Sequence, residues 1–331
     1  MAEMKRATFI ASLAVVLAAF AALICAPAEA LAGAKRGLEV CAGVIVPALL
    51  PFLIVSALLT GLGLPQLLAR AAGPLFTKLF GVSGAAAAPF LLGLTGGYPV
   101  GAAATAELCR RGELGGEEGS RILPFCNNTG PAFILGAAGT GVFSSGRAGV
   151  LLYLSHILTA VAVGVLMSIG RPRGTAAAAA MANKPIEVRS LVHVLPESVK
   201  GAVVSTLNIC GYVVFFSVIT GLLDALGIFT SVAAYLATHL GLEPRFTRAL
   251  LTGFLELGSG VSAMRGLSLT PLNLALASFV LGFGGLSVHC QTLAAVDGTG
   301  IRAARHFAGR LLHGAVSALL VFLLASALDT F

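Results

Sequence analysis

The sequence contains no tryptophan and very little charge, and these two shortages fix the class of protein. Charged residues make up 11% of the chain, whereas roughly 25% is usual for a soluble domain. So few charges cannot cover a water-facing surface of this size. The hydrophobic share is 57% and the mean hydropathy is +0.95. Because the apolar runs are long and do not alternate as β-barrel strands do, the sequence predicts an all-α polytopic membrane protein.

Motifs of soluble enzymes are also missing. The chain has no nucleophile elbow, zinc-protease motif, phosphate-binding loop or kinase signature. The six cysteines include no CxxC pair and lie in or beside apolar segments, which favours small packing residues over disulfides or a zinc site. We therefore expect no enzymatic activity, no cofactor and no metal.

The formal net charge of +7 comes from short basic clusters between apolar runs. This placement is typical of topology signals and contacts with lipid headgroups, and it argues against binding to nucleic acid. The clusters are Lys5-Arg6, Lys35-Arg36, Arg110-Arg111, Arg171 with Arg173, and Arg302 with Arg305.

The N-terminus allows two readings. A basic start and the apolar run 7–25 precede a small-residue motif at Ala28–Ala30, as in a cleaved signal peptide. The run is long for a signal peptide and just sufficient to span a membrane. The many later apolar segments favour a retained first helix.

Nine apolar segments have spanning length. They are 7–26, 39–63, 83–109, 122–143, 147–170, 200–223, 246–264, 270–296 and 306–328. Shorter apolar pieces at 65–80 and 226–241 are expected to lie in the interface or to re-enter. Residues 110–121 and 171–198 are polar, and the positive charge of the second region predicts a cytoplasmic linker. The predicted domains are 1–38 (N-terminal helix and loop), 39–170 (first repeat), 171–198 (linker) and 199–331 (second repeat).

Three pairs of short stretches suggest that the halves are repeats. "LLTGLG" at 58–63 matches "LLDALG" at 222–227 with an offset of 164. "GLTGGYPVGA" at 93–102 parallels "ELGSGVSAM" at 256–264, and "FCNNTGPAFIL" at 125–135 aligns with "FVLGFGGLSVH" at 279–289 with an offset of 154. Consistent offsets in corresponding order predict an internal duplication.

Four polar, glycine-containing stretches interrupt apolar segments: "TGGYPVG" (95–101), "CNNTGP" (126–131), "ELGSG" (256–260) and "GFGGLSVHCQ" (282–291). A helix broken in hydrocarbon frees backbone groups, which is tolerated only where they are buried in protein or line a cavity. Broken helices at corresponding positions of two repeats indicate the binding site of a transporter. A single break is more often a packing feature, so it is the combination that carries the prediction.

The residues at the breaks suit a polar or anionic ligand. Half-helix N-termini present free N–H groups, Asn127 and Asn128 supply donors and acceptors, and Tyr98 offers a ring face and a hydroxyl. Glu256 is a candidate for ion coupling because a carboxylate inside a membrane is functional by default, although pairing with Arg265 is an alternative. His289 is a core residue, a proton-coupling group or a ligand contact.

The stretches "GGYPVGA", "FCNNTGPAFILG" and "GFGGLSVHCQ" resemble the signatures of sporulation integral membrane proteins in the nucleoside-recognition (Gate) domain superfamily. The resemblance covers residues 40–325 and is strongest to the stage V sporulation dipicolinic acid transporter. It implies two Gate-type repeats with broken and re-entrant helices, similar to concentrative nucleoside transporters. It also implies a cell membrane location, specifically the outer forespore membrane of an endospore-forming bacterium.

The resemblance implies ligand contacts at the hairpin tips and broken helices. With the residues chosen above, the predicted ligand-binding set is Thr95, Gly96, Gly97, Tyr98, Asn127, Asn128, Thr129, Gly130, Ser259, Gly284, Gly285, Ser287, His289 and Gln291. The expected function is alternating-access transport of a small planar anion, dipicolinate. A nucleoside or nucleobase carrier and a non-transporting membrane scaffold for spore formation remain alternatives. Expected partners are the anion, membrane lipids, a coupling H+ or Na+ and a second copy of the chain.

Overall fold

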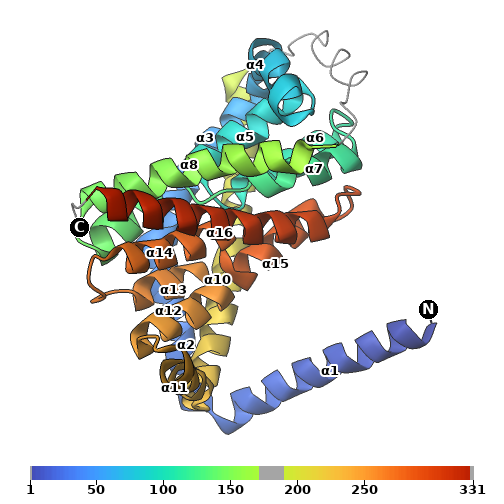
Figure 1. Cartoon of the computed structure of the whole chain (residues 1–331). Coiled ribbons are helices and arrows are strands. Elements are labelled where there is room, and N and C mark those ends of the chain that lie inside the picture. Colours follow the sequence, from blue (N-terminus) through green and yellow to red (C-terminus); the bar gives the residue numbers. More distant parts are fainter. Residues whose placement is uncertain (1, 171–189, 329–331) are drawn as a thin grey trace.

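The computed structural model describes residues 2–170 and 190–328, and these form helices without any strand (Figure 1). Four helical stretches are long and apolar enough to cross a membrane: α8 (Gly146–Ser168), α10 (Leu191–Ala225), the stretch Pro271–Val296, and α16 (Ala303–Ala327). Two sharply bent helix pairs would raise this number to six. The predicted all-α polytopic membrane fold is confirmed.

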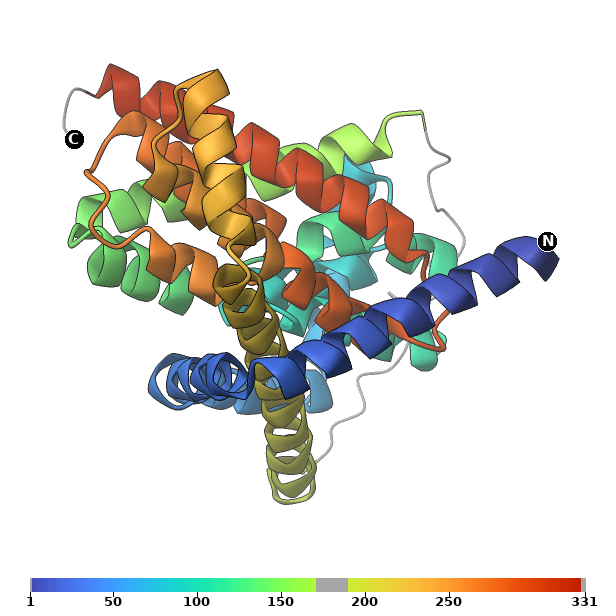
Figure 2. The same ribbon diagram turned by 90° about the horizontal axis from the view of Figure 1, so that it is seen from below.

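The N-terminal helix stands apart from the rest of the molecule (Figures 1 and 2). Helix α1 (Ala2–Cys25) meets α2 (Pro27–Val40) at a bend of 102°. A π-helical stretch, η1 (Cys41–Ile45), then leads without a break into α3 (Val46–Gly61), so the predicted domain boundary at residue 38 lies inside a continuous helical rod. Whether α1 is retained in the mature protein stays a prediction.

The rest of the first half contains a short helix, two interrupted helices and a long one. In chain order these are α4 (Leu64–Phe80), the 3-10 turn η2 (Gly84–Ala86), α5 (Ala87–Gly96), α6 (Val100–Arg110), α7 (Gly116–Cys126), the π-helical η3 (Ala132–Val142) and α8. Each interruption predicted in this half is a real break, at residues 97–99 and 127–131.

The second half repeats this order of elements. After the long α10 come α11 (Ile228–Leu240), α12 (Pro244–Leu255), α13 (Leu257–Ala263), α14 (Pro271–Phe283), α15 (Gly285–Val296) and α16. The short helices α4 and α11 both begin after a left-handed glycine, Gly63 (φ 91°) and Gly227 (φ 70°), which are the last residues of the two matched "LG" motifs. This shared order supports the predicted duplication.

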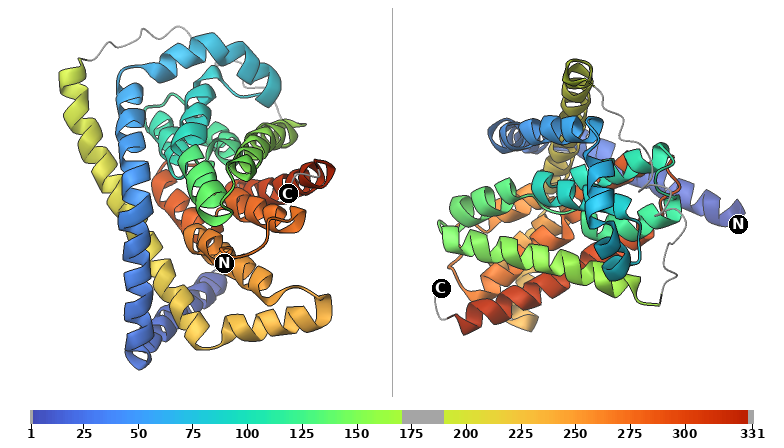
Figure 3. Two further views of the ribbon diagram at one scale, coloured as in Figure 1. Left: turned by 90° about the vertical axis from the view of Figure 1, so that its left-hand side faces the viewer. Right: turned by 90° about the horizontal axis from the view of Figure 1, so that it is seen from above.

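Corresponding helices of the two halves run in opposite directions. Figure 3 shows α2–α3 and α10 side by side and antiparallel. Figures 1 and 2 show the same for α8 and α16. Close approach of α2 to α10 depends on small residues, because a Cβ on Gly33 or Gly37 would come within 2.8 Å of the α10 backbone.

Two of the nine predicted spans are hairpins instead of crossings. Residues 83–109 and 246–264 fold back as hairpins, with α5 against α6 and α12 against α13. The helices cannot continue because Gly97 adopts φ +80° and Glu256 is extended (φ −142°, ψ 121°). By contrast, α14 and α15 remain one broken span.

Of the two predicted polar regions, the linker 171–198 differs from its prediction. Residues 171–189 of the predicted linker lie outside the described residues, and α10 already begins at Leu191. Polar side chains in its first turns, such as Glu197 and Lys200, are exposed. The helix therefore extends beyond the apolar run from which its start was predicted.

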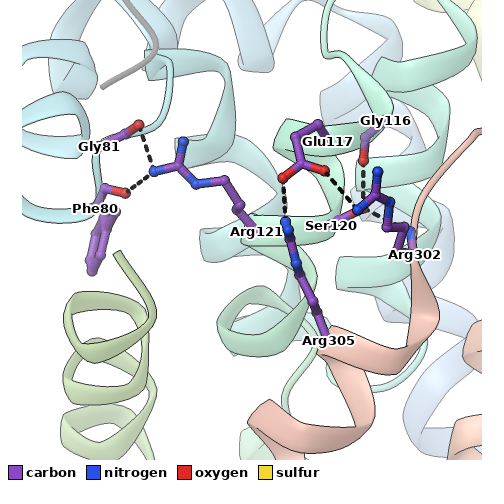
Figure 4. A network of polar contacts seen from close by, with 8 residues as sticks. All are labelled: Phe80, Gly81, Gly116, Glu117, Ser120, Arg121, Arg302 and Arg305. Atoms are coloured by element: carbon purple, nitrogen blue, oxygen red, sulfur yellow. Dashed lines mark hydrogen bonds and ion pairs between the residues drawn. The ribbon is translucent and has the colours of Figure 1, made fainter. Parts of the chain in front are cut away.

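An ion-paired cluster joins the start of α7 to the start of α16 (Figure 4). Glu117 pairs with Arg305 at 2.5 Å and with Arg302 at 3.9 Å. Ser120 accepts the backbone N–H of Arg302 at 2.7 Å, and Arg121 donates to the carbonyls that end α4. The predicted polar region 110–121 thus ties three elements together.

Candidate functional site

The first crossing of broken helices lies where the α5–α6 hairpin tip meets the α7–η3 break. A Cβ on Gly97 would lie 2.8 Å from the backbone nitrogen of Gly130. A Cβ on Gly93 or Gly101 would overlap the carbonyl oxygen of Cys126. Glycine is therefore required on both sides of the tip, because any side chain would push the two backbones apart.

The second crossing lies where the α12–α13 hairpin tip meets the α14–α15 break. Gly284 and Gly285 have φ angles of +88° and +76°. A Cβ on Gly285 would come within 2.8 Å of the Gly253 carbonyl oxygen and 3.1 Å of the Leu257 nitrogen. All four predicted interruptions are thus paired, one hairpin tip with one broken helix in each half.

Side chains connect the two crossings. The Thr129 hydroxyl donates to the carbonyl of Leu281 at 2.7 Å, and the Asn127 amide donates to the Thr292 hydroxyl at 2.8 Å. The hydroxyl of Tyr98 lies 3.4 Å from the Gly282 carbonyl oxygen. The contacts with Leu281 and Gly282 satisfy backbone carbonyls beside the α14–α15 break, as burial in hydrocarbon demands.

A cavity of about 70 Å³ lies between the crossings and is lined by residues from both halves. Eight predicted residues line it: Thr95, Gly96, Gly97, Tyr98, Thr129, Gly130, Glu256 and Gln291. Its apolar wall comes from η1, α3 and α10, through Ile45, Leu49, Phe52, Ile209 and Val213. Both π-helical stretches border it, since η3 contributes Ala132 and Phe133.

The two asparagines predicted to hold the ligand lie behind the cavity wall. Both are fully buried. The Asn127 oxygen accepts the backbone N–H of Ala102 at 3.2 Å, and the Asn128 amide donates to the Phe125 carbonyl at 2.7 Å. Their bonding capacity is therefore used mainly inside the protein, and direct contact with a ligand stays a prediction.

The remaining predicted residues also lie away from the cavity lining. Ser259, Gly284 and Gly285 shape the second crossing. Ser287 is buried and accepts a hydrogen bond from Gln291 at 3.1 Å. His289 packs between the rings of Phe283 and His306, at centroid distances of 4.8 Å and 5.2 Å, and its ring nitrogens have no hydrogen-bond partner among the described residues.

Glu256 caps its own hairpin helix. Its carboxylate is 3% exposed and accepts the backbone N–H groups of Gly258 at 2.8 Å and Ser259 at 2.5 Å. It makes no ion pair with Arg265, the alternative partner considered from the sequence, which is exposed. A carboxylate at a helix N-terminus offsets the positive end of the helix dipole.

Sequence reasoning missed Arg310, although an arginine inside the predicted span 306–328 was a visible signal. Arg310 is fully buried in α16. Its guanidinium donates to Tyr98, to the Gly282 carbonyl, to Asn128 at 3.1 Å and to His313 at 3.0 Å. It also lies 5.2 Å from the centre of the Tyr98 ring, a cation–π distance.

Two buried histidines, one in α8 and one in α16, contact each other. The rings of His156 and His313 are 4.3 Å apart, and their facing nitrogens are 3.2 Å apart. His156 also accepts the backbone N–H of Thr129 at 3.2 Å. At the offset of 154 used above, His156 aligns with Arg310 (310 − 156 = 154), and each contacts the break in its own half.

A second hollow, of about 380 Å³, lies between α3, α6 and α10. Its charged lining includes Arg110, Arg111, Glu107 and Glu197. One apolar cluster borders both hollows: Ile45, Ile209 and Val213 line the first, and Leu53, Leu92, Val100 and Ala202 line the second. No group of three or more potential metal ligands comes together in the described ranges.

Comparison with known proteins gives one informative relative. The chain is 32% identical to the sporulation integral membrane protein YlbJ of Bacillus subtilis (strain 168), and the match covers 94% of this chain and 81% of YlbJ. It belongs to the YlbJ family. No family model matches the chain, and no solved structure gives a significant match. The YlbJ family is thus one of sporulation membrane proteins, and in this member a cavity lies between two crossings of broken helices.

Proposed function

We propose that this member of the YlbJ family is a carrier of a small planar organic anion of the dipicolinate class. The observation that carries the proposal is a cavity lined by residues at or beside the hairpin tips and broken helices of both halves of the chain. Irregular backbone at membrane depth is characteristic of transporter binding sites. The arrangement of two hairpin tips against two broken helices also supports a Gate-type fold.

Transport proceeds by alternating access, and the cavity in the described conformation is too small for the whole solute. A single water requires roughly 10–15 Å³, so the cavity of about 70 Å³ holds several waters and only part of a planar dicarboxylate. The apolar cluster of Leu53, Leu92, Val100 and Ala202 separates this cavity from the second hollow. Movement of the crossings against α3 and α10 opens that barrier and joins the two spaces.

The proposed carrier performs no covalent chemistry and works at the outer forespore membrane, in keeping with the sporulation relative. Glu256 is proposed to respond to a coupling H+ or Na+, since its buried carboxylate lines the cavity. Displacement of its two backbone partners by a cation would release the α13 hairpin.

The test is uptake of radiolabelled dipicolinate by the purified full chain in liposomes, with and without Na+ and pH gradients. We expect saturable uptake and an increase in thermal stability with dipicolinate but not with uridine. Stabilisation and uptake with uridine alone would replace the anion with a nucleoside. Absence of uptake with every solute and gradient would support a non-transporting scaffold.

A further inference from the structure

Arg310 is a fully buried cation without a matching anion. Its four bonds reach a phenol, a backbone carbonyl, a carboxamide oxygen and an imidazole. Among the described residues it forms no ion pair, and its Nε has no hydrogen-bond partner. Removing a guanidinium from water is expensive, so a buried arginine with only neutral partners indicates a functional demand for its charge.

Arg310 lies directly behind the cavity wall. Tyr98 is one of the residues that line the cavity, and its hydroxyl accepts a bond from Arg310. Thr129 also lines the cavity, and its backbone N–H donates to His156 at the far end of the same network. One layer of side chains therefore separates the guanidinium from any solute, and little water intervenes to screen its field.

The hydrogen-bond pattern shows that the two histidines do not offset this charge. The backbone N–H of Thr129 can only donate, so His156 Nε2 accepts. Arginine can only donate, so His313 Nδ1 accepts. Two neutral rings then place one N–H against another at 3.2 Å, so this contact is not a hydrogen bond and brings no negative charge to the network. The network has a surplus of donors, and a further proton on either ring would increase it.

The cavity's carboxylate is stabilised separately, within its own helix. Both Glu256 oxygens accept backbone N–H groups at the N-terminus of α13, where the helix dipole is positive. The charge of Arg310 is likewise held by neutral partners, but on the side of Tyr98. The two walls of the cavity therefore differ, and the wall formed by Tyr98 and Thr129 is the electropositive one.

We infer that Arg310 determines the charge of the solute, so that the site accepts an anion and rejects a neutral molecule of the same shape. The inference rests on the proposed carrier function and specifies its substrate class. Arg310 acts through Tyr98 and Thr129 without touching the solute, and so it is a specificity-determining residue held in place by Asn128, His313 and His156.

The experiment compares two solutes of matching shape in liposome uptake: pyridine-2,6-dicarboxylate and its uncharged diamide. The wild-type chain should favour the dicarboxylate. Arg310→Gln should lower dicarboxylate uptake by about tenfold or more, equivalent to about 1.4 kcal/mol, and leave diamide uptake nearly unchanged. A purely structural arginine would lower both by the same factor.

Arg305→Gln provides the matched control, because it removes the same charge from the same helix at a site already paired with Glu117. It should leave the ratio of the two solutes unchanged. Arg310→Lys keeps the charge with fewer donors and should keep the preference at a reduced rate. A folded Arg310→Gln with the wild-type ratio, or an Arg310→Lys that loses the ratio completely, overturns the inference.

A measurement on the wild-type chain covers the case in which neither Arg310 variant folds. Thermal stabilisation by the dicarboxylate should exceed that by the diamide. Equal stabilisation would overturn the role of Arg310 while leaving a carrier in place. Failure of the wild-type chain to transport either solute would instead count against the proposed function.

Discussion

The two crossings have the same backbone design but satisfy their freed groups in different ways. At the first crossing, side chains reach across to the other half of the chain, as Thr129 does to Leu281 and Asn127 to Thr292. At the second crossing the tip is capped from within, by Glu256 on the next two backbone N–H groups of its own helix.

This difference suggests separate tasks for the two crossings, namely recognition of a solute and response to a coupling ion. The first tip is joined through Tyr98 to a buried cation, so it is fixed in position and suited to recognising a solute. The second tip is capped by one carboxylate, and both of its bonds stay within α13. We therefore assign recognition to the first crossing and the response to a coupling ion to the second.

The largest expected effect comes from destroying a crossing. In Gly93→Ala the new methyl group overlaps the Cys126 carbonyl, and because neither backbone can retreat we expect a loss of about 3 kcal/mol or more. Gly136→Ala is the control, since nothing lies within 4 Å of its Cβ position. Thermal unfolding in detergent measures both, and a Gly93→Ala protein as stable as Gly136→Ala would contradict the crossing.

The next largest effect, on uptake, tests the difference in hydrogen bonding between the two crossings. Asn128→Ala removes a donor to Phe125 and an acceptor from Arg310, leaving buried groups unpaired at a cost of about 1–3 kcal/mol each. Uptake should fall about tenfold or more. Ser259→Ala should behave as wild type, because Ser259 contributes its backbone N–H to the second crossing. Equal uptake in the two variants would remove the proposed asymmetry.

A smaller effect tests the apolar wall against which both crossings lie. Ala202 is buried in the cluster between the hollows, and its neighbour Val203 is exposed. Ala202→Phe should fill the barrier, slow uptake several-fold and cost about 1–3 kcal/mol. Val203→Phe adds a ring of the same size on the outer face and should leave uptake unchanged. Similar rates for both variants would show that the barrier is elsewhere.

The smallest effect concerns the capped tip. Glu256→Gln keeps one acceptor for the two backbone N–H groups, so we expect a loss of about 1 kcal/mol together with loss of gradient-driven uptake. Glu243→Gln is the control, because Glu243 occupies the same position before α12 without a capping bond. Gradient dependence that survives in Glu256→Gln would exclude Glu256 as the coupling residue.

Much of this arrangement could be predicted from local sequence, and the failures have a common cause. Glycine within apolar runs, with proline at two of them, predicted all four breaks, because glycine permits conformations that end a helix and proline prevents its continuation, regardless of the surroundings. The same pattern did not distinguish a hairpin from a broken span, so 83–109 and 246–264 were treated as crossings. Asn127 and Asn128 were expected in the cavity but lie behind it, since periodicity does not say which polar group faces a ligand.

The sequence by itself determined a helical membrane protein that is interrupted at four places in two similar halves. It could do so because composition and the conformational effects of glycine and proline act locally. The tertiary structure decided that the interruptions meet in pairs, that a cavity remains between the pairs, and that Arg310 lies behind its wall. These are contacts between residues as far apart as 98 and 310, and only the packing of the whole chain can bring them together.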